Sequence, residues 1–151
     1  MNIVINKISP ISRSEYPEVM LVWEASVRAT HHFLKEEDIL LFRKLIPEQY
    51  LDNVKLNSIR DLNYKILGFL GTSVDSIEML FIHPDARGKG FGSALLNYAV
   101  NELHLNKVDV NEQNKQAVGF YSHRGFSVIS RSELDSSGKP YPILHMEIIS
   151  K

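Results

Sequence analysis

Residues 82–96, IHPDARGKGFGSALL, constrain the fold most, because a strand-like run passes through a glycine-rich turn directly into a helical pattern. Glycine lets successive turn amides converge on one point, and the start of a helix adds the positive end of its dipole. Arg87 and Lys89 contribute two positive charges. The segment therefore predicts an anion site, and the alternative is a plain strand-to-helix connection in which glycine only eases the turn.

Two nucleotide-binding motifs do not fit this turn. A Walker A loop requires Gly-x-x-x-x-Gly-Lys-Ser/Thr, but His83 stands at its first glycine and Gly90 follows Lys89. The dinucleotide motif Gly-x-Gly-x-x-Gly fails at Ser93, where the third glycine should be. Neither nucleotide fold is expected.

The apolar pattern predicts one α/β domain spanning residues 1–151, in the order β-α-α-β-β-β-α-β-α-β-β. Period-two alternation or short apolar runs predict strands, and three-to-four spacing predicts helices. The expected strands are 2–8, 52–59, 64–72, 76–84, 106–112, 126–134 and 141–149. The expected helices are 12–34, 35–46 (stopping before Pro47), 90–103 and 114–125.

Composition excludes several classes of function. The 17 Lys and Arg balance 18 Asp and Glu, so no overall field attracts nucleic acid or an anionic membrane. The chain has no cysteine, which rules out disulfides, thiolate metal ligands and cysteine nucleophiles. The beginning does not look like a signal peptide, and no apolar run approaches the ~20 residues that cross a bilayer. A cytoplasmic protein is expected.

Two motifs carry a family resemblance. Arg87, Gly90 and Gly92 match Arg/Gln-x-x-Gly-x-Gly/Ala, and residues 114–126 match Asn-x-x-Ala-x-x-Phe-Tyr-x-x-x-Gly-Phe. In these motifs the chain resembles the GNAT superfamily of N-acetyltransferases, and more narrowly the bacterial YjaB-like acetyltransferases. The resemblance implies a central, mostly antiparallel sheet of about seven strands flanked by about four helices.

The resemblance also implies acetyl-CoA as co-substrate and assigns residues to it. The glycine loop would hold the pyrophosphate, the backbone of the strand before it would pair with the pantetheine arm, and Asn114 would cap its helix, bind the pantetheine, or both. The implied residues are Leu80, Phe81, Ile82, Arg87, Gly88, Lys89, Gly90, Phe91, Gly92, Asn114 and Tyr121.

Tyr121 is similar to the family tyrosine that faces the coenzyme sulfur. A tyrosine keeps its proton at neutral pH and can give it to a departing thiolate. The alternative is a core aromatic, although Phe120 beside it is expected to serve the core better. Tyr121 is therefore the candidate catalytic acid.

Glu78 is the candidate base, because a carboxylate within the apolar run SIEMLFI needs a reason to be there. Strand alternation leaves open a structural role, in which Glu78 points to solvent or pairs with a cation. A histidine or water are the other candidates for accepting the proton of the amine.

His31 and His32 do not suggest a metal site, since adjacent residues on a helix face different ways and no HExxH motif follows. With Trp23 and Phe33 they are expected to line the acceptor cleft. A histidine that caps the last helical carbonyls is the alternative.

The sequence thus predicts an enzyme that transfers acetyl directly from acetyl-CoA to an amine, either a protein lysine or N-terminus or a small molecule. Two alternatives stay open: a coenzyme-A-binding regulatory module without chemistry, and a toxin that acetylates aminoacyl-tRNA. No nucleic-acid or membrane partner and no metal are expected, and the protein is expected to be a monomer or homodimer.

Overall fold

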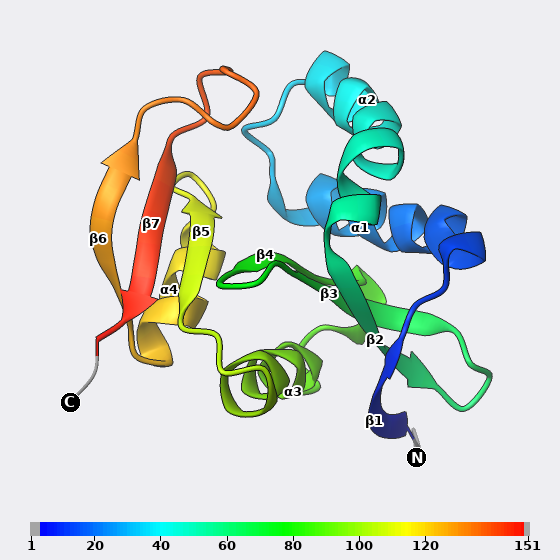
Figure 1. Ribbon diagram of the computed structural model, residues 1–151. Helices are drawn as coiled ribbons and strands as arrows, with labels where there is room; N and C mark the ends of the chain where they lie inside the picture. The colour runs from blue at the N-terminus through cyan, green and yellow to red at the C-terminus, as the bar shows by residue number, and fades with distance from the viewer. Residues whose placement is uncertain (1–3, 150–151) are drawn as a thin grey trace.

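The computed structural model describes residues 4–149 and shows an α/β fold with one seven-stranded sheet and four α-helices (Figure 1). The strands are β1 (Val4–Pro10), β2 (Lys55–Asp61), β3 (Ile66–Thr72), β4 (Ile77–Ile82), β5 (Lys107–Asn111), β6 (Phe126–Ser132) and β7 (Ile143–Ile148). The helices are α1 (Tyr16–Thr30), α2 (Glu36–Leu45), α3 (Phe91–Asn97) and α4 (Lys115–His123). The predicted order of elements is confirmed; of the strand expected over 2–8, residues 2 and 3 lie outside the described residues.

The sheet is mostly antiparallel, as predicted, and runs in the order β1-β2-β3-β4-β5-β7-β6. Among the described strands, β4 and β5 alone run parallel, and they share a single residue pair, Ile77 with Val108. Beyond that pair the two strands diverge, and the sheet opens between them (Figure 1). The candidate functional site lies at this split between β4 and β5.

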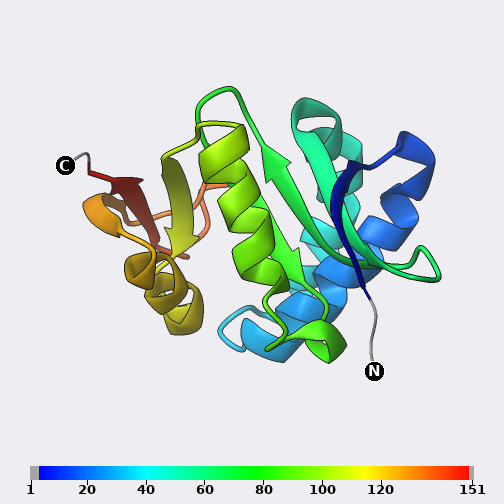
Figure 2. The same ribbon diagram turned by 90° about the horizontal axis from the view of Figure 1, so that it is seen from below.

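Each face of the sheet has its own hydrophobic core. α3 and α4 lie on the same face of the sheet (Figure 2). On β4, Leu80 and Ile82 pack with residues of α3 and α4, whereas Met79 and Phe81 pack with residues of α1 and α2. Successive side chains on a strand point to opposite faces, so one strand serves both cores. Packing on both faces of the sheet therefore holds β4 in place beside the split.

Pro47 does not end the second helical segment. The α-helix ends at Leu45 as expected, but the chain continues in a wider π-turn, Ile46–Tyr50, closed by a hydrogen bond from Leu51 N–H to the Ile46 carbonyl. Proline clashes with the carbonyl four residues before it, and a wider turn moves that carbonyl away. The sequence predicted the break in the α-helix but not the turn that replaces it.

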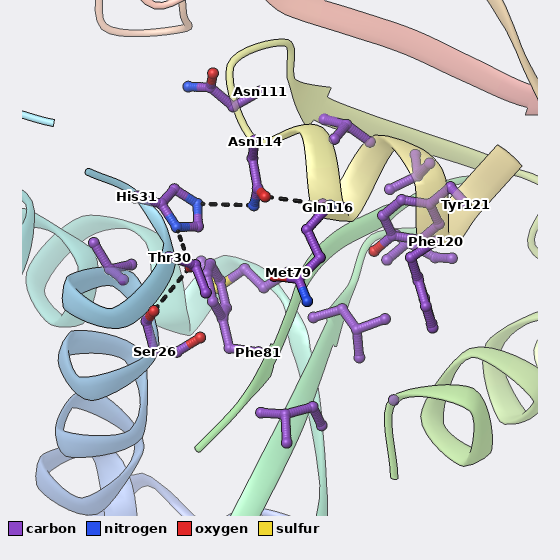
Figure 3. A pocket seen from close by; sticks show the side chains of 18 of the residues that line it. Ser26, Thr30, His31, Met79, Phe81, Asn111, Asn114, Gln116, Phe120 and Tyr121 are labelled. Carbon is purple, nitrogen blue, oxygen red and sulfur yellow. Dashed lines mark hydrogen bonds between the residues drawn. The ribbon is translucent and has the colours of Figure 1, made fainter. Parts of the chain in front are cut away.

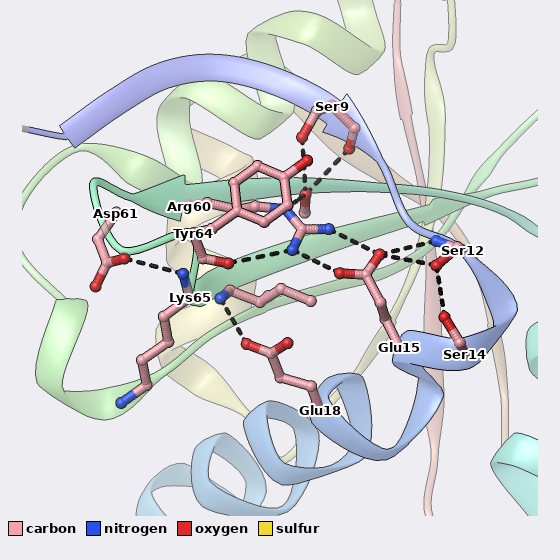
Figure 4. Close-up of polar contacts among 11 residues, drawn as sticks. Ser9, Ser12, Ser14, Glu15, Glu18, Arg60, Asp61, Tyr64 and Lys65 are labelled. Carbon is pink, nitrogen blue, oxygen red and sulfur yellow. Dashed lines mark hydrogen bonds and ion pairs between the residues drawn. The ribbon is translucent and has the colours of Figure 1, made fainter.

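A buried arginine ties the start of α1 to the β2–β3 hairpin (Figure 4). Arg60 on β2 is 2% exposed, and its guanidinium donates to both carboxylate oxygens of Glu15, at 2.7 and 3.0 Å. It also donates to Ser58 Oγ at 2.9 Å and lies 4.3 Å over the ring of Tyr64. The hydrogen bonds from Arg60, followed by one from Ser12 N–H, lower the pKa of Glu15 to about 2.

Candidate functional site

The divergence of β4 from β5 leaves backbone groups of β4 open. His83 N–H donates to the Leu67 carbonyl on β3 at 2.8 Å. N–H and C=O groups alternate from side to side along a strand, so the groups of Phe81 also face β3. Those of Leu80 and Ile82 then face the split. Of the three positions assigned to the pantetheine, these two offer backbone hydrogen bonds and Phe81 does not.

The glycine loop adopts a backbone that other residues disfavour. Gly88 and Gly90 have φ angles of 75° and 86°, and α3 begins directly after them at Phe91. Within residues 4–149, no protein acceptor takes a hydrogen bond from the backbone N–H groups of residues 88–92. These amides are therefore available to a ligand, which favours the anion site over a plain connection.

Positive charge surrounds the loop. The exposed Arg87 and Lys89 form no ion pair with any described carboxylate, and Arg87 lines the cleft. Arg124, which sequence analysis missed, also lines the cleft, where its guanidinium lies 4.0 Å over the ring of Phe120 and donates to Ser93 Oγ. Its place directly before the motif glycine at the end of α4 is the signal that could have identified it.

α4 contributes two of the predicted residues. Asn114 Oδ1 accepts a hydrogen bond from Ala117 N–H at 3.2 Å, so the predicted helix cap is confirmed. Tyr121 is 6% exposed, and its ring packs edge-on against Phe120 and Phe126, with centroids 5.2 and 5.5 Å away. The expectation that Phe120 fills the core better is wrong, because Phe120 is only half-buried, next to the glycine loop.

The Tyr121 hydroxyl points into the cleft (Figure 3). Among the described residues it has no hydrogen-bond partner, and burial of the ring raises the pKa of the phenol well above its usual range. The phenol is thus fully protonated at neutral pH, and its hydrogen is free to be donated to a ligand.

A cleft of about 610 Å³ follows the split and brings most of the predicted residues together (Figure 3). The predicted residues that line it are Trp23, His31, Glu78, Leu80, Phe81, Ile82, Arg87, Gly88, Gly90, Phe91, Gly92, Asn114 and Tyr121. Lys89, His32 and Phe33 are not among the lining residues; His32 is exposed, and Phe33 packs against His31 with ring centroids 5.2 Å apart.

Sequence analysis missed other lining side chains. Besides Arg124, the wall contains Phe42, Met79, Asp109, Gln116 and Tyr141. They come from separate elements on both sides of the split, and no local pattern connects them. Only the folded sheet makes them neighbours.

His31 is the first residue beyond α1, and its backbone N–H donates to the Val27 carbonyl at 2.7 Å. The imidazole lies near the rings of Phe33 and Phe81, with centroids 5.2 and 6.3 Å away. Burial, followed by the charges of Arg87 and His32, lowers its pKa to about 4. The ring is therefore neutral at pH 7.

Glu78 is exposed at the rim of the cleft. Its carboxylate accepts hydrogen bonds from Ser76 Oγ and from Ser73 Oγ, the latter at 3.0 Å, and pairs with no described cation. The role of Glu78 as the base stays a prediction.

A clasp of three residues, Asp38, Lys139 and Tyr141, joins α2 to the segment between β6 and β7, and Tyr141 also lines the cleft. Asp38 on α2 is buried; it accepts a hydrogen bond from the Tyr141 hydroxyl and lies 2.9 Å from Lys139 Nζ. Both partners belong to the segment between β6 and β7, which crosses towards the α1–α2 connection (Figure 1). The hydrogen bonds of Tyr141 and then Lys139 lower the pKa of Asp38.

Within residues 4–149, no group of three His, Asp or Glu side chains is placed to hold a metal ion. None of the described helices is both long and apolar enough to span a bilayer.

Comparison with known proteins decides the family. A family model described as an acetyltransferase (GNAT) domain matches residues 42–149. The chain belongs to the GNAT N-acetyltransferases. It is 42% identical over 139 residues to the peptidyl-lysine N-acetyltransferase YjaB of Escherichia coli K12, covering 89% of this chain and 91% of that protein. The Salmonella typhimurium protein of the same name is 37% identical over 139 residues, covering 90% and 95%.

Solved structures agree with this assignment. The solution structure of apo YjaB from E. coli superposes with a TM-score of 0.88 at 36% identity, over 99% of both chains. The PaiA N-acetyltransferase of Thermoplasma acidophilum, solved in complex with coenzyme A, shares the fold with a TM-score of 0.74 at 17% identity, over 95% of this chain and 98% of that one.

The site fits acetyl-CoA on its own geometry. The unbonded amides of residues 88–92 and the charge of Arg87 suit a pyrophosphate, and the open edge at Leu80 and Ile82 suits an amide-containing chain. The Tyr121 hydroxyl points into the same cleft (Figure 3). One ligand can therefore meet all three features.

Proposed function

We propose that this GNAT enzyme transfers the acetyl group of acetyl-CoA directly to the side-chain amine of a lysine in a protein. The observation that carries the proposal is a single cleft that unites unbonded loop amides, an open strand edge and a free phenol hydroxyl. The names of the E. coli and Salmonella relatives support a peptidyl-lysine acceptor.

Three groups of the chain bind and orient the coenzyme in this proposal. The N–H groups of residues 88–92, with Arg87, hold the pyrophosphate. The backbone of Leu80 and Ile82 pairs with the pantetheine amides, and the open N–H groups there are in position to polarise the thioester carbonyl. Acetyl-CoA supplies the activated acetyl group, and the protein contributes its position relative to the amine.

Tyr121 gives its proton to the sulfur as the thiolate leaves. The phenol stays protonated because its ring is buried, while the hydroxyl remains open to the cleft. The alternative of a regulatory module that binds coenzyme A without chemistry gives no reason for such a hydroxyl.

The acceptor enters from the face of α1 and α2 in this proposal. Apolar side chains of Trp23, Phe42 and Phe81 suit the methylene stem of a lysine, and the lining carboxylates of Glu78 and Asp109 suit its positive charge. A cytoplasmic location and a monomeric or homodimeric state belong to the same proposal.

The test compares Gly90→Asp with Gly90→Asn by isothermal titration of acetyl-CoA. Both side chains tolerate a positive φ, and no atom lies within 4 Å of a Cβ at Gly90, so the variants differ mainly in charge. We expect the Asp variant to lose at least about tenfold more affinity than the Asn variant. Equal affinities, or wild-type protein that leaves lysine peptides unacetylated by mass spectrometry, would contradict the proposal.

A further inference from the structure

The hydrogen bonds of His31 define which ring nitrogen carries the proton. Thr30 Oγ1 donates its one hydrogen to the Ser26 carbonyl at 2.9 Å. In its 2.7 Å contact with His31 Nδ1 the hydroxyl can then only accept. Nδ1 is therefore protonated, and in a neutral ring Nε2 carries a lone pair that can accept.

A second contact, from the other side of the split, requires the same tautomer (Figure 3). Asn114 Oδ1 is occupied by the N–H of Ala117, so its amide nitrogen is the atom that faces His31 Nε2, at 3.4 Å. An amide N–H can only donate, so Nε2 must accept. At 3.4 Å the bond is long and weak, and a ligand N–H can replace it.

The groups around His31 leave it neutral. α1 contributes Thr30, α4 contributes Asn114, and β4 contributes Phe81, all uncharged. The charged or titratable groups are Arg87, on the loop after β4, and the adjacent His32, both of which disfavour the imidazolium. No carboxylate of the described chain forms an ion pair with His31. A lone pair on a neutral, oriented base thus faces the cleft.

We propose that His31 Nε2 is the proton acceptor for the attacking amine, and that Thr30 is a positioning residue that holds the required tautomer. The inference rests on the proposed function. As the nitrogen bonds to the acetyl carbon and the carbon–sulfur bond breaks, the nitrogen loses one proton to Nε2. The thiolate takes the Tyr121 proton, and solvent carries the proton of His31 back to Tyr121.

Coenzyme binding changes the charge that faces this base. Arg87 is one of the charges that disfavour protonated His31, and the anionic pyrophosphate proposed to bind there compensates that charge. Burial, the larger cause of the lowered pKa of His31, remains, so the pyrophosphate offsets only the smaller contribution of the Arg87 charge.

The test measures pH profiles of kcat and kcat/KM for lysine-peptide acetylation by wild type, His31→Gln, Thr30→Val and the control His123→Gln. Glutamine keeps a hydrogen-bonding side chain but does not titrate, and His123 is exposed at the end of α4. We expect His31→Gln to lower kcat about 100-fold or more. The acid limb of the kcat profile should disappear, while the acetyl-CoA Kd stays within about threefold.

Thr30→Val and nitrogen NMR give readouts that a purely structural role would not change. We expect Thr30→Val to lower kcat less than His31→Gln, and its imidazole spectrum to show both tautomers. Wild type should show protonated Nδ1.

Two outcomes would overturn the inference: protonated Nε2 in the wild type, or His31→Gln with unchanged kcat and pH profile. If the wild type acetylates no amine, the proposed function fails, and this step fails with it. If the wild type is active and the His31→Gln substitution changes neither kcat nor the pH profile, the proposed function stands and His31 is not the proton acceptor.

Discussion

A tyrosine with a buried ring can act in an active site only if its hydroxyl lies outside the core in which the ring packs. Tyr121 meets this condition, because its ring contacts Phe120 and Phe126 while its hydroxyl finds no partner among the described residues. The core restricts the ring to one orientation, and the cleft receives the hydroxyl. A tyrosine with this geometry can donate its hydrogen without losing a bond within the protein.

Tyr121→Phe should therefore separate chemistry from binding and from stability. The substitution removes only the hydroxyl, so we expect the melting temperature and the acetyl-CoA Kd to stay close to wild type, while kcat falls about 100-fold. Calorimetry and coenzyme release measure these quantities. Unchanged coenzyme release would instead show that a group other than Tyr121 protonates the departing thiolate.

At the scale of elements, α1 is anchored at its start by the Arg60–Glu15 pair. Removing one partner of a buried pair leaves an uncompensated charge, which costs more than the pair contributes. The pKa of Glu15 is lowered from 4.5 to about 2, so its stabilising effect is present above pH 4.5 and is lost as pH falls towards 2.

Glu15→Gln should lower the free energy of unfolding by about 2 to 3 kcal/mol at pH 7. The difference from wild type should shrink below about pH 4 and vanish near pH 2, where Glu15 itself is protonated. Urea unfolding at several pH values measures it. A difference independent of pH would show that the carboxylate charge is not the cause.

The clasp of Asp38, Lys139 and Tyr141 holds the segment between β6 and β7 against α2. Tyr141→Phe removes the hydroxyl that binds Asp38 and leaves Lys139 in place. We expect a destabilisation of about 1 kcal/mol and an acceptor KM that rises severalfold, with little change in the acetyl-CoA Kd. Steady-state kinetics in both substrates tests this, and a larger effect on the coenzyme would contradict it.

Local sequence patterns predicted the helices and strands. Contacts between residues far apart in the sequence could not be predicted in the same way. The alternation along β4 and the glycines before α3 are local signals, and they located the strand, the turn and the coenzyme loop. The Arg60–Glu15 and Asp38–Tyr141 contacts join residues 45 and 103 positions apart, and no periodicity encodes such pairs. For the same reason Phe42 and Tyr141, from segments distant in sequence, were missed at the site.

At the scale of the whole molecule, one parallel residue pair joins two half-sheets. The half with β1 to β4 carries the glycine loop after β4, and the half with β5 to β7 leads into α4 and Tyr121. A ligand in the split pairs with one half and contacts the other. Coenzyme binding should therefore complete the sheet at the point where the protein leaves it open.

Amide hydrogen exchange tests this completion residue by residue. Without ligand, the Leu80 and Ile82 amides face the split and should exchange at least about 100-fold faster than the Phe81 amide, which faces β3. Saturating acetyl-CoA should reduce this difference in exchange rate, because only the Leu80 and Ile82 amides gain hydrogen-bond partners. A ligand that stabilised the fold without pairing to β4 would slow exchange at Phe81 alone and increase the difference. The direction of the change thus distinguishes strand pairing from binding elsewhere.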